Sequence, residues 1–113
     1  MKARNLLLGA TPYPVETALR KLGADLKTAR LRRNLTGEEA AQKIGTSRFT
    51  VADAERGKPS TSVAVYAALL WAYGLVDRLA DLADPSKDEE GARLALAREP
   101  ARARHRQTLS DDF

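Results

Sequence analysis

Hydrophobic residues recur at helical spacing along most of the chain. Between Pro14 and Arg33, an apolar side chain returns every three or four residues, at Leu19, Leu22, Leu26 and Ala29. This spacing places them on one face of a helix, and proline suits the first helical position. We therefore expect a helix from Pro14 to about Arg33. Residues 1–13, which lack this periodicity, are expected to form an N-terminal arm.

Two brief helices should follow, separated by a tight turn. The segment Thr36-Gly37-Glu38-Glu39 is a capping box, in which a threonine hydroxyl and a glutamate carboxylate satisfy the first backbone N–H groups of a helix. That helix is predicted from Gly37 to Ile44, and it stops at Gly45. The next helix begins after Ser47, a good N-cap residue, and ends at Gly57, before Pro59.

The remaining pattern predicts two further helices and a tail. A fourth helix starts after Ser62 and ends near Gly74, with one apolar face made by Tyr66, Leu69, Leu70 and Tyr73. A fifth, acidic and amphipathic, carries Leu75, Leu79 and Leu82 and ends at Asp84-Pro85. Residues 14–84 are thus expected to form one compact five-helix, all-α domain. Residues 85–113 are interpreted as a basic C-terminal tail with one short helix and then a disordered end.

Composition narrows the class of protein. Apolar residues make up 43% of the 113 residues but aromatic residues only 5%, so leucine and alanine must fill the core. The chain has no cysteine, which excludes disulfides and thiolate metal sites and fits a reducing cytosol. The apolar stretch from Leu6 to Ala10 is shorter than the roughly 7 to 15 residues of a signal peptide. No stretch approaches the roughly 18 apolar residues of a membrane span, so we expect no membrane association and a cytoplasmic location.

Charge is unevenly placed along the chain. The net charge is +4, and residues 17–33 hold six basic side chains against Asp25 alone, whereas residues 76–90 are mainly acidic. The tail is basic again, with Arg98, Arg102, Arg104 and Arg106. A basic first half favours a polyanionic partner. A solvated helix face explains the same charges, and charge alone does not separate the two interpretations.

The second and third helices describe a helix-turn-helix. Their turn contains Gly45, where the chain must leave one helix sharply. Ala40 and Ala41 are small enough for the next helix to cross closely, and Ile44, Val51 and Ala54 fall at inward positions. The outward positions of the third helix are then Ser47, Arg48, Phe49, Ala52 and Asp53.

The stretch TGEEAAQKIGTSRFTVADAERGKPS resembles the Cro/C1-type (XRE) helix-turn-helix family, which has a lambda-repressor-like fold. The resemblance covers about Leu19 to Leu82. The segments LKTARLRRNLT, YAALLWAYGL and EPARARHR further resemble HipB-like antitoxins, which repress their own operon and bind a HipA-type serine/threonine kinase toxin. The resemblance implies a bacterial homodimer that binds double-stranded DNA at an inverted-repeat operator and associates with the nucleoid when on DNA.

The resemblance also assigns roles to residues. The third helix would enter the major groove, with Arg48 on guanine, Phe49 against a thymine methyl and Ser47 on a base or phosphate. Ala52 and Asp53 complete the base-reading set. The alternatives are a solvated Arg48 and a Phe49 that packs in the core or a dimer contact. Phosphate contacts are expected from helix starts, from the loop after the third helix and from the first helix, at Thr36, Gly37, Lys58, Ser60, Thr61, Ser62, Arg32 and Arg33.

Glu55 lies near a helix C-terminus, where the helix dipole disfavours a carboxylate. In the family that the chain resembles, an arginine of the first helix pairs with this glutamate, which here is Arg30. The alternative is an exposed Glu55 neutralised by Arg56. Three departures from the family pattern weaken the DNA interpretation: Gly37 replaces a polar phosphate contact, Asp53 is negative where relatives are basic, and Ala52 offers only a methyl group.

Three classes of function follow. The first is a dimeric sequence-specific repressor, with or without a toxin partner. The second is a protein-interaction module with little DNA binding, suggested by the acidic residues 76–90 and the arginine tail, which contacts either DNA or a partner protein. An enzyme is the weakest hypothesis, since His105 is the only histidine and the chain has no catalytic triad, phosphate loop or metal-ligand cluster. We therefore expect no catalysis and no cofactor or metal.

Overall fold

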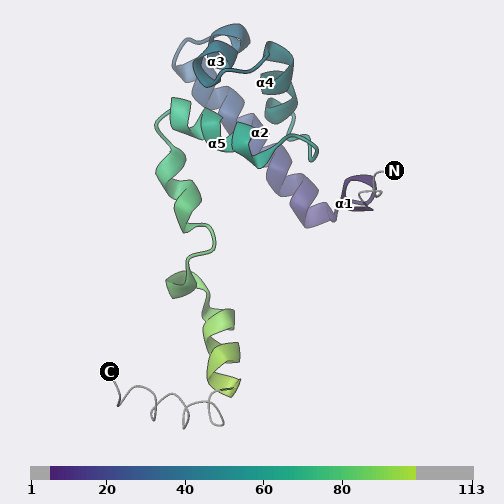
Figure 1. Ribbon diagram of the computed structural model, residues 1–113, viewed down its shortest axis with the longest axis vertical. Helices are drawn as coiled ribbons and strands as arrows, with labels where there is room; N and C mark the ends of the chain where they lie inside the picture. Colours follow the sequence, from purple (N-terminus) through teal and green to yellow (C-terminus); the bar gives the residue numbers. More distant parts are fainter. Residues whose placement is uncertain (1–5, 99–113) are drawn as a thin grey trace. The chain divides into compact units, whose positions relative to one another are not determined.

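The structure is a computed structural model that describes residues 6–98. Within this range all regular structure is helical, which confirms the all-α class. The chain forms two compact units, Met1–Leu79 and Ala80–Phe113. The first unit contains every helix of the predicted helix-turn-helix (Figure 1). The division between the two units lies after Leu79, within the segment Val76–Asp81.

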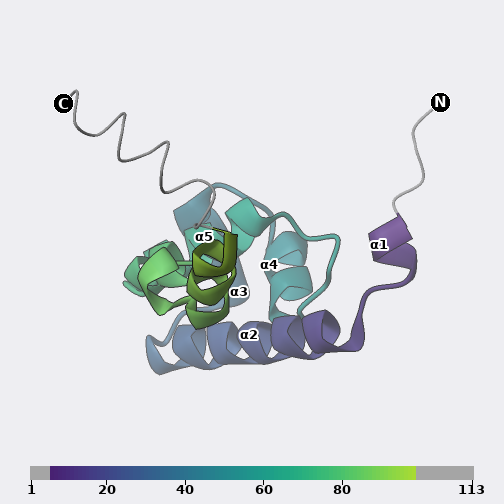
Figure 2. The ribbon, with the colours of Figure 1, turned by 90° about the horizontal axis from the view of Figure 1, so that it is seen from below.

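The first unit is built on one long helix. Helix α2 (Tyr13–Arg32) has α3 (Gly37–Ile44), α4 (Arg48–Glu55) and α5 (Val63–Ala72) on one of its sides (Figure 2). Helix α4 contacts α2, α3 and α5. It is therefore the helix whose position depends most on its neighbours, although it is only eight residues long.

The core consists mainly of small and medium-sized side chains. Ala40 and Ala41 of α3 and Ala54 of α4 are fully buried, so α3 and α4 approach closely, as the sequence suggested. Leu26 from α2 and Leu69 from α5 fill the space around them. The buried hydrophobic residues are Leu26, Ala29, Ala40, Ala41, Val51, Ala54, Tyr66, Leu69 and Tyr73.

Two glycines allow α4 to lie directly against α2. A Cβ atom on Gly23, in the middle of α2, would lie 2.5 Å from the carbonyl oxygen of Ala54 and 2.6 Å from that of Glu55. Gly57, just after α4, has φ of +71°, and a Cβ there would overlap the backbone of Leu19 and Arg20. A glycine inside a helix costs about 0.5–1 kcal/mol relative to alanine, and here it permits backbone-to-backbone contact.

The N-terminal arm differs from the expectation. A single helical turn, α1 (Leu6–Gly9), occupies part of it, and the Thr11 hydroxyl donates to the Leu7 carbonyl at 2.8 Å. Helix α2 begins at Tyr13, with Pro14 inside its first turn, so Tyr13 belongs to the helix and not to the arm. One turn is too short to show the periodicity that identifies longer helices.

The segment expected as the fifth α-helix is also different. Residues Val76–Asp81 form a 3₁₀-helix, η1, and Leu82 is 78% exposed. Gly74 ends α5 with φ of +75°, and the Leu75 N–H returns to the Leu70 carbonyl at 2.7 Å. Of the three leucines that suggested an amphipathic helix, Leu75 packs against the core. Short connectors that follow a helix often adopt 3₁₀ geometry.

In the second unit, η2 (Pro85–Lys87) precedes a helix at residues 89–98. Asp84 caps η2, and its hydrogen bond from the Ser86 N–H holds the pKa of the Asp84 carboxyl below its ordinary value. Asp88 accepts from the Gly91 N–H at 2.9 Å at the start of the following helix. The short helix expected in the tail is therefore present, and the expected disorder at the end of the chain lies outside the described residues.

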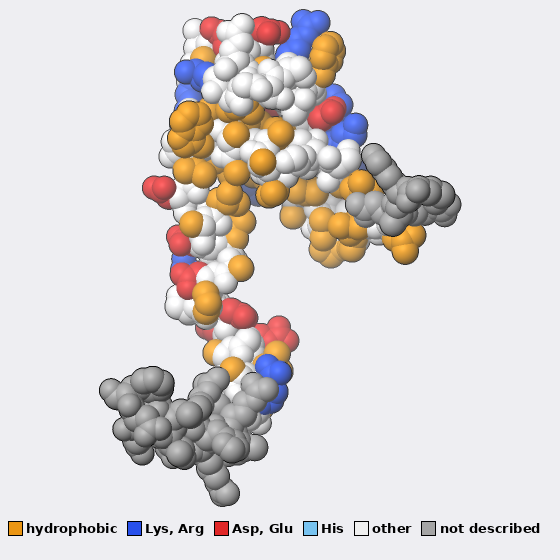
Figure 3. All heavy atoms as spheres, in the orientation of Figure 1, with side chains coloured by type: hydrophobic (Ala, Val, Ile, Leu, Met, Phe, Trp, Pro, Cys, Tyr) orange, Lys and Arg blue, Asp and Glu red, His pale blue; other side chains and the backbone are white. Residues whose placement is uncertain are grey.

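Hydrophobic side chains remain at the surface of the first unit, on the face where α5 lies (Figure 3). Val63 and Trp71 of α5 are 72% and 62% exposed. Within residues 6–98, these side chains leave one face of α5 largely uncovered. No helix within residues 6–98 is long and apolar enough to cross a membrane.

Candidate nucleic-acid interface

The start of α3 is fixed by its own side chains. The Thr36 N–H donates to Glu39 Oε1 at 2.9 Å, and the Glu39 N–H donates to Thr36 Oγ1 at 3.0 Å, which is the capping box that the sequence indicated. The hydrogen bond from the Thr36 backbone holds the pKa of the Glu39 carboxyl below its ordinary value. The first backbone N–H groups of α3 therefore have a defined direction.

The turn between α3 and α4 requires a residue in the left-handed backbone conformation. Gly45 has φ of +75°, and the Thr46 N–H returns to the Ala41 carbonyl at 2.9 Å. Ser47 then caps α4 by accepting from the Thr50 N–H at 3.2 Å. Its hydroxyl also lies 3.1 Å from Thr50 Oγ1. The Ser47 side chain thus positions α4, and its hydroxyl already has two partners.

Helix α4 has a buried side and an exposed leading edge. Val51 and Ala54 are 1% and 0% exposed and fix the helix to the core. Phe49 is 69% exposed and Arg48 is also exposed. The guanidinium carbon of Arg48 lies 5.0 Å from the centre of the Phe49 ring, within the range of a cation–π interaction. The first turn of α4 therefore presents a cation and an aromatic ring to solvent.

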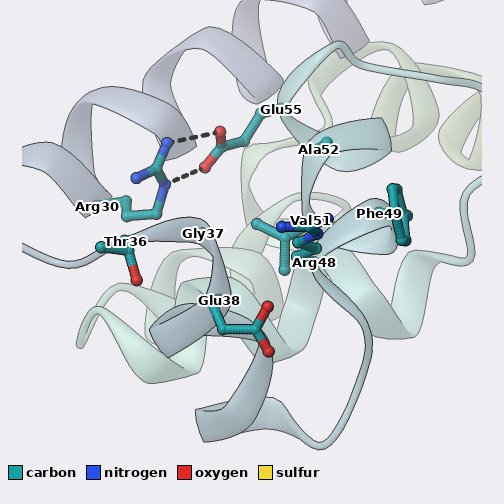
Figure 4. A pocket seen from close by; sticks show the side chains of 9 residues that line it. All are labelled: Arg30, Thr36, Gly37, Glu38, Arg48, Phe49, Val51, Ala52 and Glu55. Carbon is teal, nitrogen blue, oxygen red and sulfur yellow. Dashed lines mark hydrogen bonds and ion pairs between the residues drawn. The ribbon is translucent and has the colours of Figure 1, made fainter.

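A hollow of 450 Å³ lies between the start of α3 and the outer side of α4. We call it the α3–α4 hollow, and Figure 4 shows its lining side chains. They come from α2, from the beginning of α3 and from α4: Arg30, Thr36, Gly37, Glu38, Arg48, Phe49, Val51, Ala52 and Glu55. The hollow thus joins the backbone at the α3 start to the exposed edge of α4.

Arg30 and Glu55 form a pair on the inner side of this hollow. Arg30 Nε and Nη2 donate to the two Glu55 carboxylate oxygens at 2.7 and 3.1 Å, and Nη1 donates to the Leu35 carbonyl at 2.8 Å. Their side chains are only 12% and 10% exposed. The Glu55 hydrogen bonds raise the pKa of Arg30. The pair ties the end of α4 to the end of α2 and to the loop before α3, because Arg30 donates both to the Glu55 carboxylate and to the Leu35 carbonyl.

A family model described as a helix-turn-helix domain matches residues 21–83, more than half of the chain. The chain belongs to this helix-turn-helix family. The match includes α3, the turn at Gly45 and α4, and it agrees with the XRE-type resemblance of the sequence. It identifies the protein as a DNA-binding regulator. No curated protein matches the chain closely enough to be compared with it.

Three of the five expected base-reading residues line the α3–α4 hollow. Arg48, Phe49 and Ala52 line the α3–α4 hollow, whereas Ser47 and Asp53 do not. The Asp53 carboxylate pairs with Arg56 and lies 3.7 Å from the Lys58 ammonium group. The negative charge that weakened the DNA interpretation is therefore balanced by two cations of the same domain.

The expected phosphate contacts also separate into groups. Thr36 and Gly37 line the α3–α4 hollow beside Arg48. The loop after α4 holds Lys58, Ser60, Thr61 and Ser62, and Ser62 caps α5 by accepting from the Ala64 N–H at 3.0 Å. The Tyr66 hydroxyl donates to the Lys58 carbonyl at 2.9 Å and fixes this loop to α5, and burial raises the Tyr66 pKa.

Arg32 and Arg33 lie elsewhere in the helix-turn-helix domain. Both line a different hollow with Asp25 and Leu75, and neither lines the α3–α4 hollow. Arg33 donates to the carbonyls of Ala29 and Tyr73, at 2.9 and 2.8 Å, and its guanidinium lies 5.6 Å from the centre of the Tyr73 ring. It therefore links the ends of α2 and α5, a structural role that the sequence did not suggest.

The tail residues assigned to DNA or partner contact are only partly described. Arg98 is exposed and belongs to the helix in the second unit. Arg102, Arg104 and Arg106 lie outside the described residues, as does His105. Within residues 6–98 no group of His, Cys, Asp or Glu side chains is suited to hold a metal ion.

Sequence reasoning missed three residues that shape the interface. Gly23 permits the contact between α2 and α4, and its position inside a helical pattern was the available signal. Glu38, which we attributed to helix capping, lines the α3–α4 hollow with Arg48. Tyr66 was assigned to the apolar face of α5, but its hydroxyl also holds the loop after α4.

Proposed function

We propose that the protein is a sequence-specific transcriptional repressor that binds an inverted-repeat operator as a homodimer. The observation that carries the proposal is the exposed leading edge of α4, where Arg48 and Phe49 stack on each other beside the α3–α4 hollow. In DNA-binding helix-turn-helix domains, the N-terminal residues of the second helix reach base edges in the major groove.

The geometry of Arg48 supports base recognition. It makes no hydrogen bond or ion pair within the described chain, so its planar set of donors is available for a guanine edge. The start of α3, with Thr36 and Gly37, lies in the same hollow and suits a phosphate of the adjacent backbone. Two such surfaces in a dimer would contact successive major grooves about 34 Å apart.

The test is a binding measurement on duplexes that carry the promoter of the protein's own operon and on random duplexes of equal length. We expect at least a hundredfold preference for the promoter at a salt concentration near physiological. Arg48→Ala should reduce this preference by about tenfold or more, since a bidentate contact discriminates by roughly 1–3 kcal/mol.

Lys27→Ala is the matched control for Arg48→Ala. It removes the same charge from an exposed position of α2 outside the hollow. Lys58→Ala should weaken binding to all sequences by a similar factor, because a phosphate contact carries no sequence information. Equal affinity of the wild-type protein for promoter and random duplexes would reject the repressor proposal.

A second role, as the antitoxin of a HipBA-type operon, is supported by the resemblance of three sequence segments to HipB-like antitoxins. In this role the protein binds and neutralises a HipA-like serine/threonine kinase. The acidic residues between Val76 and Glu90 and the arginines from Arg98 to Arg106 give a mixed charge pattern along the sequence, distinct from that of α4. Such a mixture of charges suits a protein partner better than a polyanion.

This role is tested by purification of the tagged full-length chain from its native host. We expect a kinase to co-purify, and co-expression of the chain should relieve the growth arrest that the kinase causes alone. A chain truncated before Ser86 should lose the kinase and keep its promoter preference. A regulator without a toxin partner would instead purify alone and still bind its promoter.

A further inference from the structure

The Arg48 and Phe49 side chains form one surface and not two independent contacts. They are consecutive residues at the start of α4, and their side chains converge so that the guanidinium lies 5.0 Å from the ring centre. Phe49 remains 69% exposed despite this stack. A cation–π interaction at an exposed site restricts both side chains, so less conformational freedom is lost when they meet a ligand.

A second arginine stacked on an aromatic ring provides the comparison. Arg33 lies 5.6 Å from the centre of the Tyr73 ring, and both of its terminal nitrogens donate to backbone carbonyls, those of Ala29 and Tyr73. Tyr73 is buried, at 3% exposure. The Arg33–Tyr73 stack is therefore part of the fold, whereas the Arg48–Phe49 stack leaves both the guanidinium donors and the ring open to solvent.

The chemistry of the exposed stack selects a type of base step. A guanidinium fits the O6 and N7 acceptors of guanine, and an apolar ring fits the C5-methyl group of thymine. The two groups are 5.0 Å apart, which exceeds one base-pair step of about 3.4 Å and is less than two. Two side chains that contact each other over this distance therefore contact neighbouring base pairs and not the same one.

We propose that the Arg48–Phe49 stack recognises a thymine followed directly by a guanine on one strand of each operator half-site, with Phe49 on the thymine methyl and Arg48 on the guanine. The inference rests on the proposed DNA-reading function and specifies its target. The TG step is among the most easily deformed in DNA, which helps the groove to admit a bulky ring. The same stack accepts 5-methylcytosine before guanine, since that base carries the same methyl group.

The experiment begins with selection of binding sites from random duplexes by the full-length protein. We expect a TG step in each half-site. Affinity is then measured by fluorescence anisotropy on the selected duplex and on two analogues. Deoxyuridine in place of the thymine removes only the methyl group and should weaken binding about fourfold. 7-Deazaguanine in place of the guanine replaces the N7 acceptor with a C–H group and should weaken binding about tenfold.

Substitutions at Phe49 separate its contact with the thymine methyl group from its stacking on Arg48. Phe49→Leu keeps an apolar contact but removes the ring, so deoxyuridine should still weaken binding while 7-deazaguanine should weaken it less than in the wild-type protein. With Phe49→Ala, the thymine and deoxyuridine duplexes should bind equally. Val63→Ala truncates an exposed apolar residue of α5 outside the hollow. In this variant, deoxyuridine and 7-deazaguanine should weaken binding as much as they do in the wild-type protein.

A duplex with a cytosine–guanine pair in place of the thymine–adenine pair should bind weakly. Methylation of that cytosine at C5 should raise the affinity about fourfold. Selected half-sites without adjacent thymine and guanine would overturn the proposal, as would equal binding of thymine and deoxyuridine duplexes. In both cases sequence-specific binding itself would stand. A protein that selects no sequence at all would reject the repressor function and this inference with it.

Discussion

The two ends of α4 lie in opposite surroundings. At the C-terminal end, the carbonyls of Ala54 and Glu55 lie against Gly23, and the Glu55 carboxylate is bound by Arg30. At the N-terminal end, Arg48 and Phe49 are exposed and stack on each other. The last residues of this eight-residue helix therefore position it, while the first residues face the solvent. Stability should depend on the C-terminal end, and DNA recognition on the N-terminal end.

The largest effect is expected at the glycines beneath the C-terminal end. Gly57→Ala places a Cβ against the backbone of Leu19 and Arg20 and forces a positive φ on an alanine. We expect a loss of about 4 kcal/mol in the free energy of unfolding, because neither backbone can move without separating α2 from α4. Chemical denaturation followed by circular dichroism measures this loss.

Gly37→Ala is the control for Gly57→Ala. A Cβ on Gly37 meets nothing within 4 Å, and its φ is not positive. Its stability should stay within about 0.5 kcal/mol of the wild-type value. If Gly57→Ala were as stable as Gly37→Ala, the close contact of α2 with the end of α4 would be contradicted.

The next-largest loss of stability is expected when the Arg30–Glu55 ion pair is broken. Glu55→Gln leaves the Arg30 guanidinium nearly buried without its counter-charge, which should reduce the free energy of unfolding by about 3 kcal/mol. Replacing both residues, Arg30→Met with Glu55→Leu, should recover most of this loss.

The exposed pair of Lys21 and Asp25 gives the contrast for Glu55→Gln. Their side chains are 79% and 60% exposed, so Asp25→Asn should change stability by less than about 1 kcal/mol. Equal losses for Glu55→Gln and Asp25→Asn would show that burial of the Arg30–Glu55 pair does not matter. Urea denaturation of the purified variants provides the comparison.

Replacing each of two buried tyrosines with phenylalanine should change the free energy of unfolding by a smaller amount, which differs between them. Tyr66→Phe removes the hydrogen bond to the Lys58 carbonyl and should lower the free energy of unfolding by about 1 kcal/mol. The Tyr73 hydroxyl is buried without a hydrogen-bond partner among the described residues, so Tyr73→Phe should be neutral within about 0.5 kcal/mol or slightly stabilising. A larger loss for Tyr73→Phe than for Tyr66→Phe would reverse this assignment.

The smallest effect on stability is expected at the N-terminal end of α4. Arg48→Ala and Phe49→Ala remove only exposed groups and their mutual stack, so each should change the free energy of unfolding by no more than about 0.5 kcal/mol. Thermal denaturation without DNA tests this. A loss of several kcal/mol would mean that the leading edge supports the fold, and the contrast between the two ends would fail.

Features determined by nearby residues were predictable from the sequence. The capping box of Thr36 and Glu39, the Ser47 cap and the left-handed Gly45 and Gly57 each depend on a few consecutive residues. Small residues at Ala40 and Ala41 also indicated the close crossing of two helices. These local signals agree with one another, which is why the helix-turn-helix could be derived from them.

Features that depend on distant residues were not predictable in the same way. The Arg33 bond to the Tyr73 carbonyl spans forty positions, and the contact of Gly23 with the end of α4 leaves only an unexplained glycine in a helix. The spacing of Leu75, Leu79 and Leu82 fitted an amphipathic helix, but periodicity does not say whether a packing surface exists for it. For Arg48 and Phe49, the sequence indicated exposure but not their stacking, since rotamers are set by three-dimensional surroundings.

The freedom of Arg48 and Phe49 from the core has a consequence for how regulators of this kind diversify. Because neither side chain fills space inside the protein, both positions can change by single mutations without compensating changes elsewhere. A library randomised at these two codons should consist mainly of folded proteins, and its members should differ in the operators they prefer.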